Sequence, residues 1–325
     1  MKILVMGGAG YIGSHVCKAI AARGDTPIVF DNFSTGHREF VKWGPLIEGD
    51  IRNAMTLDTA FRRYTPDAVM HFAASIEVGI GEREPLAFWQ NNVAGPLNVL
   101  AAMAREGVEP FVFSSTCAVY GSPEALPITE LESRKPGNVY GRTKLGVERA
   151  LEDVSSASAL RYAALRYFNA AGASPDAEIG EKHDPETHLI PNALKSAMGV
   201  SGRFQLYGTD YPTLDGSCVR DFIHVDDLAA GHLAAVDHLI AGKESFACNL
   251  GTGTGVSVKA VIEAVENITG KSVPVDIHPR RTGDAAELYA DTAKATDLLG
   301  FTPVRSDIET IVADAWRFHQ KDWGL

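Results

Sequence analysis

The sequence predicts an α/β protein, with a doubly wound parallel sheet followed by a smaller, mixed α/β C-terminal domain. Short apolar, β-branched runs alternate with helix-like stretches through the first half of the chain. Such runs are typical of strands that are buried on both faces and joined by crossover helices. A glycine-rich segment directly follows the first run, as it does in folds that bind a phosphate at a helix N-terminus.

Five apolar runs predict the strands of the sheet, and they span residues 3–6, 28–30, 68–72, 111–113 and 162–167. After residue 167 the pattern changes to a loop-rich stretch (169–191), a helix (226–240), a strand (246–250) and a second helix (258–268). We therefore place a boundary near residue 168, which gives domains 1–168 and 169–325. The segment around 219–250 is a candidate for packing back on the first domain.

Composition and charge exclude several classes of protein. The chain has 325 residues and a net charge of −11, without a basic run that would attract nucleic acid. No apolar run reaches the ~18–20 residues that cross a bilayer, and the apolar start is too short for a signal peptide. We therefore expect a cytoplasmic protein. The four cysteines are far apart and lack the spacing of a zinc site or a disulfide framework.

Gly7, Gly8, Gly10 and Gly13 form a dinucleotide-binding pattern directly after the first predicted strand. Glycines at this spacing let the backbone turn tightly and approach a pyrophosphate at the N-terminus of the following helix, as in a Rossmann-type fold. Asp31 ends the second strand, where an acidic side chain accepts hydrogen bonds from ribose hydroxyls and repels a 2′-phosphate. We therefore expect NAD rather than NADP. Gly49, Asp50 and Ile51 end a further strand-like run, the third along the chain, and Asp50 is a candidate contact of the adenine.

Tyr140 and Lys144 are four residues apart, which places a phenol and an ammonium group on one face of a helix. Ser114, Ser115 and Thr116 end an apolar strand, at the edge of a parallel sheet where ligands bind. Together with the glycine-rich loop, these residues indicate a dehydrogenase-like site.

Over almost its full length the chain resembles the UDP-glucose 4-epimerase family of extended short-chain dehydrogenase/reductases. The matching motifs include residues 7–13, 71–74, 113–116, 140–144, 166–169, 208–213, 219–225 and 279–281. The resemblance implies reversible epimerisation at C4 of a UDP-hexose, UDP-galactose to UDP-glucose, by transient oxidation to a 4-keto sugar on tightly held NAD. It also implies a homodimer.

The same resemblance assigns roles to individual residues. The catalytic residues would be Tyr140 as the base, Lys144 as the group that lowers its pKa, and Thr116 as a hydrogen-bonding partner. The cofactor would contact Gly7, Gly10, Tyr11, Ile12, Gly13, Asp31, Asn32, Asp50, Ile51, Phe72, Ala73, Ala74, Asn91, Ser114, Tyr140, Lys144 and Tyr167. The UDP-sugar would contact Thr116, Tyr140, Asn169, His188, Leu189, Gln205, Tyr207, Arg220, Arg281 and Asp284, with Arg220 and Arg281 on the diphosphate.

Three further positions qualify this assignment. The segment from His183 to His188 has the spacing of a metal cluster, but the resemblance implies no metal there. Ile76 stands where many relatives have a lysine that reaches the cofactor pyrophosphate. Leu288 stands beside the expected sugar ring, where its bulk predicts a preference for UDP-glucose and UDP-galactose over the N-acetyl sugars.

Other functions remain open on this sequence. A nucleotide-sugar dehydratase or decarboxylase begins with the same oxidation, but Cys117 and Ala118 stand where the dehydratases have an acid/base pair. An NADP-linked reductase is opposed by Asp31. A non-catalytic dinucleotide sensor has no chemical need for Thr116, Tyr140 and Lys144 together.

Overall fold

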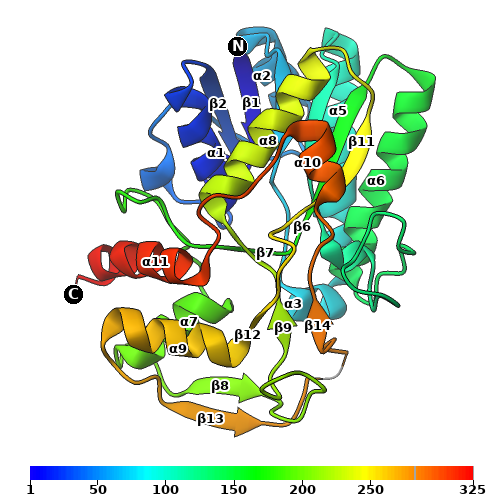
Figure 1. Ribbon diagram of the computed structural model, residues 1–325. Coiled ribbons are helices and arrows are strands. Elements are labelled where there is room, and N and C mark those ends of the chain that lie inside the picture. Colours follow the sequence, from blue (N-terminus) through cyan, green and yellow to red (C-terminus); the bar gives the residue numbers. More distant parts are fainter. Residues whose placement is uncertain (282, 325) are drawn as a thin grey trace.

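A seven-stranded parallel sheet forms the larger part of the molecule in the computed structural model, which describes residues 1–281 and 283–324 (Figure 1). The strand order is β11-β6-β5-β4-β1-β2-β3, and every neighbouring pair is parallel. The strands are β1 (Lys2–Met6), β2 (Thr26–Asp31), β3 (Leu46–Glu48), β4 (Ala68–His71), β5 (Pro110–Thr116), β6 (Arg161–Tyr167) and β11 (Phe246–Leu250). The fold class and the five predicted strands are confirmed.

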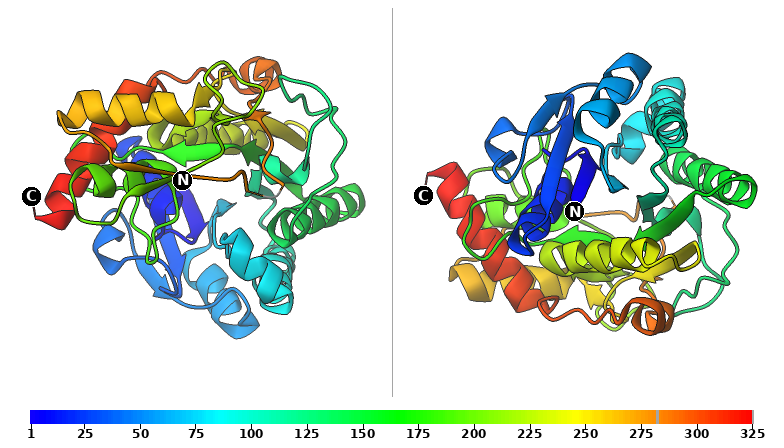
Figure 2. Two further views of the ribbon diagram at one scale, coloured as in Figure 1. Left: turned by 90° about the horizontal axis from the view of Figure 1, so that it is seen from below. Right: turned by 90° about the horizontal axis from the view of Figure 1, so that it is seen from above.

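Helices cover both faces of the sheet (Figure 2). Apolar side chains of α1 (Tyr11–Ala22), α8 (Val225–Ile240) and α10 (Ala293–Leu299) pack on one face. Those of α2 (Ala54–Tyr64), α5 (Gly95–Glu106) and α6 (Val139–Ala157) pack on the other. Because both faces are buried, the central strands carry apolar residues without alternation, which explains the continuous runs in the sequence. Short segments complete this part: η1 (Arg38–Phe40), α3 (Val78–Arg83), α4 (Pro85–Trp89), the π-helical turn η2 (Gln90–Ala94) and η3 (Cys117–Val119).

A second apolar core lies below the carboxyl ends of the strands in Figure 1. It is formed by α7 (Leu189–Ala197), α9 (Val258–Thr269), α11 (Ile308–Trp323) and the parallel pair β8 (Phe204–Tyr207) and β13 (Val275–His278), which we call the small lobe. Two short sheets connect it to the large sheet: β7 (Asn169–Ala171) with β10 (Phe222–His224), and β12 (Val256–Ser257) with β9 (Val219–Arg220) and β14 (Glu287–Leu288).

The chain passes between the large sheet and the small lobe more than once. After β6 it enters the small lobe, and then α8 packs against α1 while β11 pairs with β6 at the edge of the large sheet. The division into domains near residue 168 stays a prediction. Across residues 1–281 and 283–324, no helix combines the length and apolar content that crossing a membrane requires.

Candidate active site

A cavity of about 950 Å³ lies between the carboxyl ends of the large sheet and the small lobe. A second cavity of about 120 Å³ continues from it over the ends of β2 and β4. The two share Gly7, Gly10 and Phe72 in their walls, so a single elongated ligand can occupy both.

The glycine-rich loop forms the wall between β1 and α1, and two of its glycines are required by close approaches. Gly7 has φ +78°, and a Cβ added there would lie 2.6 Å from the backbone nitrogen of Ala73. A Cβ on Gly13 would lie 2.1 Å from the Gly7 carbonyl oxygen. Gly10 is the N-cap residue of α1 and makes no side-chain hydrogen bond, so among the residues that the structure describes the N–H groups of the first turn have no side-chain cap. These features fit the pyrophosphate of a dinucleotide.

Asp31 lies at the end of β2 and lines the smaller cavity. Its two carboxylate oxygens accept hydrogen bonds from the backbone nitrogens of Ala9 (2.9 Å) and Phe33 (2.8 Å), which fix its orientation. Burial raises the pKa of Asp31, and those backbone hydrogen bonds lower it. Asp50 lies outside the walls of both cavities, where Arg52 donates to it from Nε at 2.9 Å and from Nη2 at 2.6 Å.

Tyr140 and Lys144 reach the larger cavity from the first turns of α6. The Asn138 side chain caps this helix by accepting a hydrogen bond from the Gly141 nitrogen at 2.8 Å. A Cβ on Gly141 would lie 2.6 Å from the Ala118 carbonyl oxygen, so glycine lets α6 approach the chain directly after Thr116. The predicted catalytic residues Thr116, Tyr140 and Lys144 therefore share one wall of the cavity.

The Lys144 ammonium group is buried beside this wall. Its Nζ donates to the Ser114 carbonyl oxygen at 2.7 Å and lies 5.8 Å from the centroid of the Tyr140 ring. Burial lowers the pKa of Lys144 to about 7, and the nearby Glu148 carboxylate raises it. Burial also raises the pKa of Tyr140 well above its usual value of about 10.

A buried ion pair fixes the strand that carries Ser114 and Thr116. Glu148 accepts hydrogen bonds from Arg166 Nε (2.9 Å) and Nη2 (2.7 Å) and from Ser115 Oγ (2.6 Å). Because Glu148 is one helical turn after Lys144 on α6, these bonds tie the helix to the ends of β5 and β6.

Every residue predicted to contact the UDP-sugar lines the larger cavity. The guanidinium group of Arg220 is partly buried, and its Nη1 donates to the carbonyl oxygens of Val219 (2.8 Å) and Ala285 (3.0 Å). The Arg281 guanidinium lies 3.9 Å from the centroid of the Tyr207 ring. The remaining predicted contacts in this wall are Thr116, Tyr140, Asn169, His188, Leu189, Gln205 and Asp284.

The predicted cofactor contacts divide between the two cavities. The larger one is lined by Tyr11, Ile12, Gly13, Ser114, Lys144 and Tyr167 in addition to the shared residues. The smaller one is lined by Asn32, Ile51, Ala73 and Asn91, and Ala74 lines both. Tyr167 is hydrogen-bonded to Ser114 Oγ, and burial raises its pKa to about 12, so its hydroxyl stays protonated.

Ile76 and Leu288 differ in their placement. Ile76 lines the larger cavity and is partly exposed there. Leu288 packs against a buried group that includes Val119 and Tyr120, and it is not among the residues in the cavity wall.

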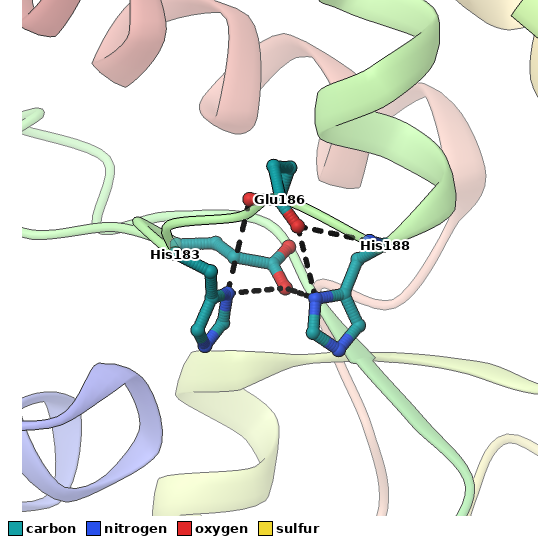
Figure 3. A group of neighbouring side chains, drawn as sticks. His183, Glu186 and His188 are labelled. Atoms are coloured by element: carbon teal, nitrogen blue, oxygen red, sulfur yellow. Dashed lines mark hydrogen bonds and ion pairs between the residues drawn. The ribbon is translucent and has the colours of Figure 1, made fainter. Parts of the chain in front are cut away.

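Sequence reasoning gave no role to several residues of the cavity wall. Thr35 lines both cavities, and its position shortly after Asp31 is the only sequence signal for it. Glu181, His183 and Glu186 come together with His188 in one wall, where all their ligand atoms lie within 4.8 Å of one another (Figure 3). Glu181 was missed because its contacts depend on how the loop folds back.

Comparison with known proteins gives consistent matches. The model of the NAD dependent epimerase/dehydratase family matches residues 3–251. A UDP-glucose 4-epimerase of Rhizobium leguminosarum bv. trifolii is 50% identical over 319 residues, covering 98% of this chain and 97% of the relative. The crystal structure of UDP-glucose 4-epimerase from Brucella ovis in complex with NAD superposes with a TM-score of 0.96 at 49% identity, covering 98% of both chains. The enzyme from Bifidobacterium longum, in complex with NAD+ and UDP, gives a TM-score of 0.93 at 37% identity over 99% of both chains.

Proposed function

The chain belongs to the NAD dependent epimerase/dehydratase family, and from this premise we propose that it interconverts UDP-galactose and UDP-glucose by epimerisation at C4, with NAD as its cofactor. The observation that carries this proposal is the position of Thr116, Tyr140 and Lys144 in the wall of the larger cavity. The glycine-rich loop lines the same cavity and the smaller one that continues from it. A sugar bound there lies beside a base and beside the reactive end of a dinucleotide.

Inversion at C4 requires that a hydride and a proton leave that carbon and its hydroxyl, and that the hydride returns to the opposite face. When bound, NAD accepts the hydride and gives it back, so that no net oxidation occurs. The protein's residues must therefore hold the proton, keep the 4-keto sugar in the site and leave it room to turn.

Tyr140 is the proposed acceptor of the hydroxyl proton. A tyrosine must lose ~3 pKa units, or ~4 kcal/mol, to act as a base near neutral pH. Burial acts in the opposite direction at Tyr140, because it raises the pKa. The cationic form of Lys144, 5.8 Å from the ring, favours the phenolate, and a positively charged nicotinamide ring adds to its effect. Thr116 is the proposed hydrogen-bonding partner of the sugar 4-oxygen.

Arg220 and Arg281 are the proposed diphosphate contacts. The two carbonyl groups that accept from Arg220 hold its guanidinium in one orientation, and the Tyr207 ring does so for Arg281. A fixed guanidinium loses little conformational entropy when it binds a phosphate through two parallel hydrogen bonds. Asp31 is the proposed ribose contact.

We also propose that the protein is a homodimer and works in the cytoplasm. Several apolar side chains of α3, α4 and α5 are solvent-exposed in the monomer: Val78 (44%), Leu86 (69%), Trp89 (40%) and Leu97 (41%). Apolar side chains gathered on neighbouring helices favour association with a second copy. Sedimentation equilibrium should give twice the mass of the chain, and Leu86→Glu should reduce it. The four unpaired cysteines fit a reducing compartment.

The activity is tested by incubating the purified protein with UDP-galactose, without added NAD, and separating the products. UDP-glucose is the expected product. A 4-keto-6-deoxy sugar would indicate a dehydratase, and a UDP-pentose would indicate a decarboxylase. Activity that appears only with a supply of NADPH would indicate a reductase.

A further inference from the structure

The Lys144 ammonium group lies where a positive charge is costly. The residue is 2% exposed, and its Nζ lies 4.9 Å from the centroid of the Phe113 ring. Among the residues that the structure describes, Nζ donates one hydrogen bond, to the Ser114 carbonyl oxygen at 2.7 Å. Because burial favours the neutral amine, a nearby anion is needed to hold the proton on this nitrogen near neutral pH.

Glu148 supplies a negative charge one helical turn after Lys144 on α6. The other titratable groups around Lys144 are uncharged in the resting site. Burial lowers the pKa of His71 on β4 to about 3, and the Lys144 charge lowers it further, so this ring is neutral. Burial also raises the pKa values of Tyr140 on α6 and Tyr167 on β6, which keeps both phenols protonated.

The Glu148 carboxylate is held by two arginines of different exposure. It is buried, and it accepts hydrogen bonds from Arg166 Nε (2.9 Å) and Nη2 (2.7 Å) and from Arg134 Nη1 (3.2 Å). The Arg166 side chain is 4% exposed, whereas that of Arg134 is 30% exposed and is screened by water. Without the carboxylate, Arg166 would be a second buried cation near Lys144 and would oppose its protonation.

Ser115 connects the same carboxylate to the hydrogen-bond acceptor of the lysine. The Ser115 hydroxyl donates to Glu148 at 2.6 Å. Its backbone nitrogen belongs to the peptide group whose carbonyl oxygen, that of Ser114, accepts from Lys144 Nζ. The bond between Ser115 and Glu148 therefore holds this carbonyl group in its direction toward Nζ.

We propose, on the basis of the function proposed above, that Glu148 is a positioning residue for the epimerase reaction, because its carboxylate keeps the Lys144 ammonium group protonated and directed at the Ser114 carbonyl oxygen. Glu148 is not among the described residues in the wall of the larger cavity, so it acts through Lys144 and not on the sugar. A neutral Lys144 could not favour the phenolate of Tyr140, and the base of the reaction would be lost.

The first experiment measures the proton on Lys144 directly and does not use epimerase activity. The protein is labelled with a carbon isotope at Cε of lysine and titrated by NMR, and the signal that Lys144→Arg removes identifies Lys144. Glu148→Gln keeps the shape of the side chain and removes its charge, so Lys144 should bind its proton more weakly by about tenfold or more. Glu148→Asp keeps the charge and should restore most of the proton affinity.

Two controls accompany this titration. Glu152→Gln, in a more exposed ion pair with Arg134 on the same helix, should leave the Lys144 titration unchanged. Circular dichroism and bound NAD show whether each variant is folded. If Glu148→Gln does not fold, Arg134→Met replaces it. That variant removes a partly exposed cation from the same carboxylate, so Lys144 should hold its proton more tightly.

The second experiment measures kcat for UDP-galactose against pH with the NAD-loaded protein. Glu148→Gln should move the alkaline limb of this profile to lower pH, because Lys144 then loses its proton earlier. A packing defect would lower kcat by one factor at every pH. If no variant forms UDP-glucose, the proposed function fails while the NMR titration still tests Glu148. The role of Glu148 is overturned if Lys144 titrates unchanged in Glu148→Gln, if Glu148→Asp weakens its proton affinity equally, or if Arg134→Met weakens it.

Discussion

Replacing Arg220 by alanine should weaken the binding of UDP by about two orders of magnitude. A hydrogen bond to a charged group contributes ~1.5–3 kcal/mol, and a bidentate contact with phosphate contains two of them. A loss of ~3 kcal/mol corresponds to ~100-fold in Kd at ~1.4 kcal/mol per tenfold. Asp284, whose Oδ1 lies 3.9 Å from Arg220 Nη2, would then repel the diphosphate without a nearby countercharge and add to the loss.

Two further variants separate charge from orientation. Arg220→Lys keeps the charge but cannot donate to the carbonyl oxygens of both Val219 and Ala285 while it binds phosphate, so we expect a loss of about tenfold. Arg62→Ala, in an exposed ion pair with Glu106 on α2, is the matched control and should bind UDP normally. Isothermal titration of the NAD-loaded protein with UDP measures all three without turnover. If Arg220→Ala changes Kd by less than about tenfold, the diphosphate lies elsewhere in the cavity.

Three other perturbations test separate parts of the structure. Tyr140→Phe keeps the ring but removes the base, so kcat for UDP-galactose should fall by ~10²–10⁴ while bound NAD, measured after denaturation, stays unchanged. Glu148→Gln leaves the buried Arg166 unpaired and should lower the free energy of unfolding in urea by ~3–5 kcal/mol, whereas Glu152→Gln, in a more exposed pair on the same helix, should change it by less than ~1 kcal/mol. Acid should destabilise the protein. Burial lowers the pKa of five histidines below the usual value of ~6.5, and four of them to about 4 or lower, so between the folded and unfolded pKa values the unfolded chain binds more protons and stability falls as pH falls from ~6.5 toward 4. Carboxylates with raised pKa values oppose this, and the two that are raised to a value near or above pH 6, Asp226 at about 6 and Glu181 at about 7, bind two protons in the folded chain at pH 5. For these four histidines and two carboxylates alone, a net two protons at ~1.36 kcal/mol each predict a loss near ~2.7 kcal/mol per pH unit around pH 5, and thermal scans that show constant stability from pH 6.5 to 5 would contradict it. The four histidines are His15 and His71, at about 3, and His232 and His319, at about 4.

The strands of the large sheet and the glycine-rich loop could be predicted because each leaves a short pattern in the sequence. Strands that are buried on both faces need runs of apolar residues, and a backbone that approaches itself as closely as it does at Gly7 and Gly13 needs glycine. Asp31 follows from its place at the end of such a run. Each signal is a short pattern of neighbouring residues, so it can be recognised in the sequence even where, as at Gly7, the close approach is to a distant residue, Ala73.

The missed features depend on contacts between distant parts of the chain. The sheet of β12, β9 and β14 has strands of two residues, too short to produce a period in the sequence. One of the two carbonyl groups that orient Arg220 belongs to Ala285, 65 residues later. No pattern among neighbouring residues in the sequence indicates contacts of this kind.

The place of β11 in the sheet affects how the protein emerges from the ribosome. β6 ends at residue 167 and its outer neighbour β11 begins at residue 246, so 246 − 167 = 79 positions separate them. At ~5–20 residues per second, translation leaves β6 without that neighbour for roughly 4–16 s. During this time its open edge can pair with another nascent chain. A truncated product that stops near residue 168 keeps this edge permanently, and we expect it to aggregate rather than accumulate as a free nucleotide-binding fragment.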